Sequence, residues 1–209
     1  MVGDPAAAGD PARAYGVFVP ALFIQLSLFG GAFVGITLVT EFREGVLERV
    51  LATPAPRAAI LFGKVLRDCA VLTVQALLVA GAAVLLGFRI PIVGLVGCLG
   101  LVALVTAALS SVSYAVALAS KDEQALANVF NALLLPAVLL AGVMLPMALA
   151  PAWLRAVSAA NPLTYVVEGA RAAAAGNFAD GTLLLGYASA AAMAGACVAF
   201  ACWVFRRQD

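Results

Sequence analysis

Three glutamates recur at helical spacing in residues 41–68, the stretch with the highest density of charge. Glu44 and Glu48 are four residues apart, and Glu41 lies nearly one turn before Glu44. Carboxylates on one helix face can bind a basic groove of another protein, and such docking would relieve the repulsion between like charges at this spacing. The alternative is an amphipathic helix lying on the membrane surface, whose polar face is usually rich in Lys and Arg. Because acidic and basic side chains are mixed here, we favour docking to a partner.

The apolar residues of this stretch also follow a helical period. Phe42 and Val46 are four residues apart, and Leu47 widens the apolar stripe. Thr40 is suited to cap the helix N-terminus. Gly45 would then lie mid-helix, where glycine costs about 1 kcal/mol relative to alanine; it is either needed for close approach of another backbone or a harmless weakness. The residues assigned to this docking helix are Glu41, Phe42, Glu44, Gly45, Val46, Leu47, Glu48 and Arg49.

The residue types give no support for catalysis, metal binding or nucleotide binding by this chain. The chain has no histidine, so catalysis by histidine and histidine metal sites are excluded. The four cysteines fall inside apolar runs without a Cys-x-x-Cys spacing, as small buried hydrophobic residues do. The fragment nearest to a phosphate-binding P-loop, Gly63-Lys64, lacks both the upstream glycine and the Ser or Thr. We therefore expect no catalytic residue, no metal site and no cofactor bound by this chain.

The helices around the charged stretch are predicted to cross a membrane. The composition is 65% hydrophobic and 11% charged, whereas soluble domains are about a quarter charged. Five apolar runs approach or exceed the roughly 20 residues that span a bilayer, and none contains Asp, Glu, Lys or Arg. Residues 1–209 are thus predicted to form a single domain of the all-α class, a polytopic transmembrane helical bundle with a cytoplasmic coupling helix and a short external helical hairpin. The predicted spans are 17–40, 69–88, 92–119, 125–149 and 182–205.

The connecting segments indicate the orientation. Eight basic residues lie in the segments on the side of residues 41–68, against four on the other side. The positive-inside rule therefore places residues 41–68 and the C-terminus in the cytoplasm. Within this stretch, Pro54 and Pro56 should end the docking helix, and a second short helix from Arg57 to about Arg67 should lead into the next span.

Residues 151–178, on the predicted external side, show two short helical patterns. One covers 152–159, and the other covers 163–175 after Asn161-Pro162, which is a helix start signal. The second holds a glutamate and an arginine that can pair three residues apart. The hairpin is either a pair of interfacial helices that cap the bundle or an outer gate over a translocation path. The gate candidates are Asn161, Pro162, Tyr165, Glu168 and Arg171.

Two motifs in these segments resemble the membrane subunits of type-two ABC exporters, which include drug-resistance and polysaccharide or lipid export permeases. The pattern E-x-x-E-G-x-L-E-R-x-L-A-T-P, from Glu41 to Pro54, is similar to the family's cytoplasmic coupling segment. The run N-P-L-T-Y from Asn161, followed by Glu168 and Arg171, is similar to the external helices before the family's last span. Family members usually have six spans and this chain has five, so we expect the first span to be missing, as in a fragment or a mis-called start.

The resemblance implies a permease subunit of an ATP-driven ABC exporter that moves a hydrophobic or amphipathic substrate, such as a drug, lipid or glycan, outward across the cell (plasma or inner) membrane. The implied partners are an ABC ATPase on a separate chain, which uses ATP and Mg²⁺, a second permease subunit in a homodimer or heterodimer, and the lipid bilayer, but no nucleic acid. The alternative is a non-transporting scaffold that anchors a cytoplasmic partner. A secondary carrier is disfavoured because the predicted spans hold no charge to carry a coupling ion. Gly31 and Gly35 could permit close helix contact at a dimer seam.

Overall fold

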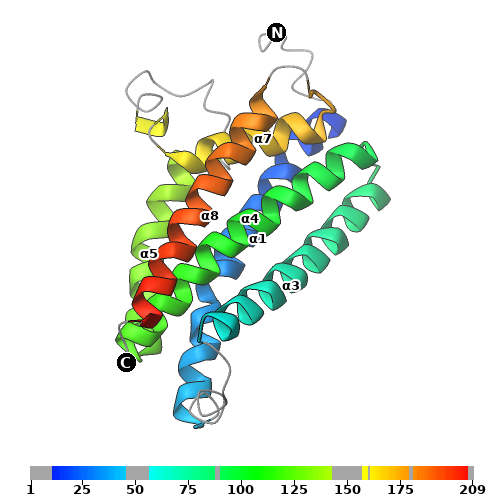
Figure 1. Cartoon of the computed structure of the whole chain (residues 1–209). Helices are drawn as coiled ribbons and strands as arrows, with labels where there is room; N and C mark the ends of the chain where they lie inside the picture. The colour runs from blue at the N-terminus through cyan, green and yellow to red at the C-terminus, as the bar shows by residue number, and fades with distance from the viewer. Residues whose placement is uncertain are drawn as a thin grey trace.

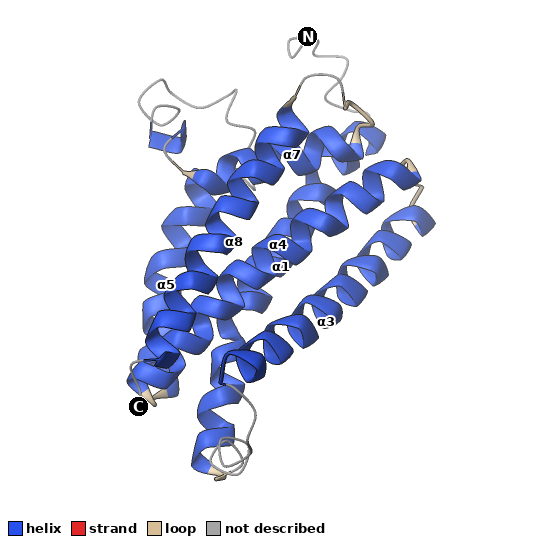
Figure 2. Ribbon diagram, in the orientation of Figure 1, coloured by secondary structure: helices blue, strands red, loops and turns tan. Residues whose placement is uncertain are grey.

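The protein is built from helices throughout the part of the chain that the computed structural model describes. That part comprises residues 11–45, 57–87, 90–142, 157–159, 161–178 and 181–206, and it contains no strand (Figures 1 and 2). In chain order the helices are α1 (Pro11–Arg43), α3 (Arg57–Leu85), α4 (Ile92–Ser120), α5 (Glu123–Leu140), α7 (Pro162–Ala174) and α8 (Thr182–Arg206). The predicted all-α fold class is confirmed.

Five of these helices are long and apolar enough to cross a membrane. Their apolar side chains face outward to a large extent, as shown by Leu85 at 90% and Ile92 at 81% exposed. A surface of this kind is unfavourable in water and suits contact with lipid. The chain is therefore a multi-pass membrane protein. The membrane-competent segments are Phe18–Arg43, Ala59–Leu85, Ile92–Ser120, Glu123–Leu140 and Thr182–Val204.

Helix α4 is the centre of the bundle, because it contacts every other helix that the structure describes. Helices α8 and α3 flank it on opposite sides, with α3 at the edge of the bundle (Figure 1). Helix α1 ends and α3 begins at one end of the bundle, which we call the α1–α3 end. Helix α7 lies at the opposite end, the α7 end (Figure 1).

Buried apolar side chains form two clusters, one toward each end. The cluster toward the α7 end joins all six helices named above and includes Phe23, Val102 and Val166. The cluster toward the α1–α3 end joins α1, α3, α4 and α5 and includes Leu61 and Phe130. Because lipid is as apolar as these side chains, the clusters hold the helices together through close packing rather than through exclusion of water.

Glycines make a close contact between α1 and α4 possible. A Cβ added at Gly35 would lie 2.6 Å from the carbonyl oxygen of Ser113, and one at Gly31 would lie 3.3 Å from that of Thr106. Gly35 N–H also donates to Ser113 Oγ at 2.9 Å. The glycine pair is therefore used for packing within the chain, which corrects its assignment to a dimer seam.

The helices that flank the charged stretch begin and end differently from the prediction. Helix α1 continues through Thr40, whose hydroxyl donates to Ile36 O at 3.1 Å in the manner of a mid-helix residue, so Thr40 is not an N-cap. Helix α3 runs without a break from Arg57, so the short helix expected to end near Arg67 and the following span are one helix. Helices α4 and α8, in contrast, agree with the predicted runs to within one residue at each end.

Helix α5 is shorter than the predicted run 125–149. The Asp122 side chain caps its N-terminus by accepting from Gln124 N–H at 3.0 Å. The helix ends at a turn in which Gly142 has a φ of 68°, a left-handed conformation that suits glycine after a helix. Residues 143–150, where the predicted run continues, lie outside the described residues. The observed end of α5 matters because α7 packs against it.

Candidate functional site

At the α1–α3 end, the last turn of α1 is tied to three other parts of the chain. Glu41 forms an ion pair with Lys64 of α3, and both side chains are largely buried. Arg43 lies 3.2 Å from the Glu123 carboxylate at the start of α5. The Lys121 ammonium lies 4.6 Å from the centre of the Phe42 ring. Glu41 and Phe42, two of the predicted docking residues, thus contact their own chain.

The predicted docking helix does not start at Thr40, because this region is the end of α1. Glu44 and Gly45 form a turn after Arg43, and Gly45 has a φ of 70°. Its N–H donates to Phe42 O at 3.2 Å, and an added Cβ would meet no atom within 4 Å. Gly45 is therefore needed for a left-handed helix end rather than for close approach of a backbone. The remaining predicted docking residues, Val46, Leu47, Glu48 and Arg49, lie outside the described residues.

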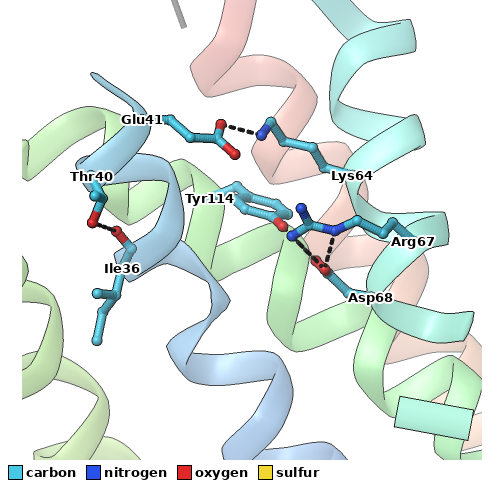
Figure 3. Close-up of polar contacts among 7 residues, drawn as sticks. All are labelled: Ile36, Thr40, Glu41, Lys64, Arg67, Asp68 and Tyr114. Atoms are coloured by element: carbon cyan, nitrogen blue, oxygen red, sulfur yellow. Dashed lines mark hydrogen bonds and ion pairs between the residues drawn. The ribbon is translucent and has the colours of Figure 1, made fainter. Parts of the chain in front are cut away.

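Deeper in the bundle, a buried carboxylate joins α3 to α4 (Figure 3). Asp68 is only 4% exposed. One of its oxygens accepts from the hydroxyl of Tyr114 at 2.5 Å, and the other accepts from the Arg67 guanidinium at 3.0 and 3.2 Å. Both oxygens are thereby satisfied, as a carboxylate removed from water requires.

Asp68 lies well inside the helix that crosses the membrane. At 1.5 Å per residue it is about 16 Å along α3 from Arg57, within the membrane-competent segment Ala59–Leu85. That segment also contains Lys64 and Arg67. The apolar run predicted as a span, 69–88, is thus part of a longer helix that begins at Arg57 and carries these charged residues in its first half.

Sequence reasoning did not find this cluster. Asp68 was assigned to a connecting segment because it directly precedes an apolar run. Tyr114 lies inside the apolar run 92–119, and a buried tyrosine hydroxyl usually has a hydrogen-bond partner. This residue was therefore the signal in the sequence that could have indicated a polar contact here. Nothing in the sequence paired the two, since 46 residues separate them.

The residue before Tyr114 fastens another helix to α4. Ser113 Oγ accepts from Gly35 N–H and donates to Ala32 O, both on α1. Consecutive residues of α4 therefore attach α1 and α3, the two helices that flank the residues between Arg43 and Arg57. This arrangement can hold those helices in a fixed relation to the centre of the bundle.

At the α7 end, side chains of α7 bind the terminal carbonyl groups of α5. Asn161 caps α7 by accepting from Leu163 N–H at 3.1 Å, and its Nδ2 donates to Ala137 O at 2.9 Å. Arg171 donates to Gly142 O at 2.8 Å. Ala137 O also accepts from Ala141 N–H, and Gly142 lies in the turn after α5. Leu140 O, at the last residue of α5, accepts from the Thr164 hydroxyl at 3.4 Å. Helix α7 thus binds the C-terminal end of α5.

The other gate candidates lie on the outer side of α7. The Tyr165 hydroxyl donates to Ala159 O at 2.9 Å, while Pro162 and Glu168 are exposed. Burial lowers the pKa of the Arg171 guanidinium, and the nearby Glu168 carboxylate opposes this shift. Of the five gate candidates, Asn161 donates to α5, and Arg171 donates to the turn that follows α5.

Neither end has the arrangement of a catalytic centre or a metal centre in the described part of the chain. No three His, Cys, Asp or Glu side chains come together there as metal ligands would. Cys69 and Cys98 donate from sulfur to the carbonyl oxygens of Ala103 and Ala170, at 3.4 and 3.3 Å.

Comparison with known proteins gives matches over most of the chain. Residues 7–174 match the family model described as ABC-2 type transporter. Two curated proteins, from Escherichia coli strains K12 and O157:H7, are 28% identical over 154 residues, and each is named "Probable multidrug ABC transporter permease YbhR". The match covers 72% of this chain and 41% of each relative, so the chain spans less than half the length of these relatives. No solved structure matches it.

Proposed function

This chain belongs to the ABC-2 type transporter family, and we propose that it is a permease subunit that exports its substrate at the expense of ATP hydrolysed on another chain. The family match over residues 7–174 is the observation that carries this proposal. A permease of this family works with an ATPase in general; the separate chain, the use of ATP and Mg²⁺ there, and the outward direction are parts of the proposal.

The residues between Arg43 and Arg57 are proposed as the contact site for the ATPase. They follow directly from the ion-paired last turn of α1 and lead into the ion-paired first half of α3. A movement of this stretch would therefore displace α1 and α3, which are bonded to the rest of the bundle. The excess of basic residues on this side supports a cytoplasmic location in a cell membrane.

The α7 end is proposed as the external side, with α7 as part of an outer gate. Its contacts with Ala137 O of α5 and with Gly142 O in the turn after α5 support this role, because a shift of α7 would break them. The relatives are named as multidrug permeases. Together with the apolar helices, this name supports a hydrophobic or amphipathic substrate for the present chain.

Asp68 belongs to the membrane-competent segment Ala59–Leu85, so a secondary carrier has to be weighed again. The family match argues for ATP-driven transport instead. In the described structure, moreover, both oxygens of Asp68 are engaged by Arg67 and Tyr114. To carry a coupling proton, Asp68 would have to lose its contacts with Arg67 and Tyr114 and bind a proton instead.

The test is co-purification. The tagged chain is expressed with candidate P-loop ATPases encoded beside its gene, and ATP hydrolysis is measured for the complex and for each chain alone. The proposal predicts a stable complex that hydrolyses ATP and a permease chain that does not hydrolyse ATP by itself. Hydrolysis by the isolated permease chain would contradict it. A complex with a partner that has no P-loop would instead support the scaffold alternative.

A further inference from the structure

We propose that Asp68 is a positioning residue that locks α3 to α4 through Tyr114, so that a displacement of the residues between α1 and α3 is passed to α4. This proposal rests on the proposed function, because it takes those residues to be the contact site for the ATPase. The lock itself is defined by contacts within this chain: the Tyr114 hydroxyl on one carboxylate oxygen of Asp68 and the Arg67 guanidinium on the other.

Helix α3 is held by one buried apolar face, which includes Leu61, Leu72 and Ala76, while the rest of its apolar surface gives little preference for one register along the bundle. It lies at the edge of the bundle (Figure 1), and Leu66 and Leu78 are 71% and 70% exposed. Its glycines, Gly63 and Gly81, have open space where a Cβ would be. Apolar side chains gain nearly as much from lipid as from α4, so contacts of this kind permit sliding. A directional hydrogen bond with a buried hydroxyl does not permit sliding.

The lock is not explained by stability alone. A buried ion pair gains little net stability, because the cost of removing charges from water offsets their attraction, and an apolar pair of similar volume is often as stable. The best-attested use of such a group is to select one register among alternatives. Asp68 and Tyr114 fit this use because they join α3 and α4 through a direct bond between side chains, next to the sulfur contact of Cys69 with Ala103 O.

The contacts of α4 show where a displacement would go next. Ser113, beside Tyr114, holds α1 at Gly35, so both helices that flank the proposed contact site are attached to α4 at one level. Toward its other end, α4 packs closely on α7: a Cβ at Gly94 would lie 2.2 Å from Ala173 O. Helix α4 therefore connects the proposed ATPase side with the helix that binds the end of α5.

The experiment measures distances between pairs of spin labels in the full chain, bound to its ATPase, with the native cysteines replaced by alanine. One pair, at Ala59 and Ala119, reports the register of α3 against α4; both positions are exposed. A second pair, at Ala119 and the exposed Ala199 of α8, reports the movement of α4. Each pair is measured without nucleotide and after trapping with ADP and orthovanadate.

In the otherwise unsubstituted chain we expect one distance for the α3–α4 pair in both states and a nucleotide-dependent shift for the α4–α8 pair. Tyr114→Phe and Asp68→Ala should each add a second α3–α4 population displaced by about one helical turn, ~5 Å, and should abolish the α4–α8 shift. Asp68→Asn retains an acceptor for the Tyr114 hydroxyl and should preserve the single population. Tyr187→Phe is the matched control, because its hydroxyl donates to α4 at Gly97 O, 2.8 Å away, from α8 instead of α3.

A single α3–α4 population in both Tyr114→Phe and Asp68→Ala would overturn the proposal. So would a second population in Tyr187→Phe, because it would show general loosening rather than a lock. Failure of the proposed function has a different signature: the unsubstituted chain would bind no ATPase and show no nucleotide-dependent shift. Even then, a register change in Tyr114→Phe and Asp68→Ala, measured on the chain alone, would support the role of Asp68 in holding α3 to α4.

Discussion

The two ends of the bundle are held together by different kinds of contact. At the α1–α3 end, side chains contact side chains: Glu41 with Lys64, and Asp68 with Tyr114. At the α7 end, side chains contact backbone carbonyl groups, as Asn161 does with Ala137 O. The first kind joins helices that are complete in themselves. The second kind holds α7 against the C-terminal end of α5.

This difference indicates what each end can do. Ion pairs and side-chain hydrogen bonds can exchange partners without unwinding a helix, so the α1–α3 end can rearrange while α1 and α3 stay intact. At the α7 end, a shift of α7 breaks the side-chain hydrogen bonds to carbonyl groups at the end of α5 and in the turn after it, and the loss of hydrogen bonds is costly in lipid. The α1–α3 end is therefore suited to receive a displacement, and the α7 end is suited to stay closed until one arrives.

The largest expected effect of a single substitution is at Asp68. Asp68→Ala removes the acceptor of a buried hydroxyl and should lower the free energy of unfolding by about 3 kcal/mol. Asp122→Ala, the same change at the exposed cap of α5, should lower it by only about 1 kcal/mol. Reversible unfolding in mixed micelles measures both. Equal losses in the two variants would show that the α1–α3 end does not depend on its buried charge.

At the α7 end, Asn161→Ala should lower the free energy of unfolding by about 2 kcal/mol, because it removes both the cap of α7 and the bond to Ala137 O. Asn128→Ala is the matched control. Asn128 is exposed and accepts from Gln124 of its own helix, so its loss should change stability by less than about 0.5 kcal/mol. The same unfolding assay applies, and a loss in Asn161→Ala no larger than the control would mean that α7 does not support α5.

Replacing glycine by alanine should lower the stability of the protein at a helix end and raise it in a helix interior. Gly45→Ala places a side chain at a φ of 70° and should destabilise by about 1 kcal/mol. Gly63→Ala lies inside α3 with open space around the new Cβ, and alanine should stabilise there by about 0.5 to 1 kcal/mol. Thermal unfolding midpoints give the two signs. A stabilised Gly45→Ala variant would indicate that the helix continues through this position.

The smallest effect is expected for the exposed ion pair at the end of α1. The Arg43 and Glu123 side chains are 59% and 38% exposed, so solvent screens their attraction. Arg43→Gln should therefore change the free energy of unfolding by less than about 0.5 kcal/mol, and even less in high salt. A loss as large as that of Asp68→Ala would contradict the distinction between buried and exposed charges at this end.

The bundle could be predicted from the sequence because its signal is local. Long apolar runs give spanning helices, and α4 and α8 begin where their runs begin. The end of α1 could not be predicted in the same way. Thr40 is equally suited to a cap and to a bond with Ile36 O, and the choice depends on whether the preceding span continues. Gly45 was placed in a helix for the same reason, although it terminates one.

The sites could be predicted only in part, because the contacts that define them join distant residues. Asn161 was recognised as a helix start, but its second bond, to Ala137, depends on how α7 folds back onto α5. Asp68 was assigned to a connecting segment because a charge was assumed to end a span. Its burial becomes understandable only when Tyr114 is known to lie opposite it.

The most direct test of the proposed function is a comparison of photo-crosslinking from the two ends. The same photoreactive amino acid is placed at Glu44 or at Glu168, both of which are exposed, and the chain is irradiated in membranes that contain the ATPase. The account predicts a crosslink to a P-loop ATPase from position 44 and none from position 168. A crosslink from position 168, or from neither position while the complex is intact, would contradict it.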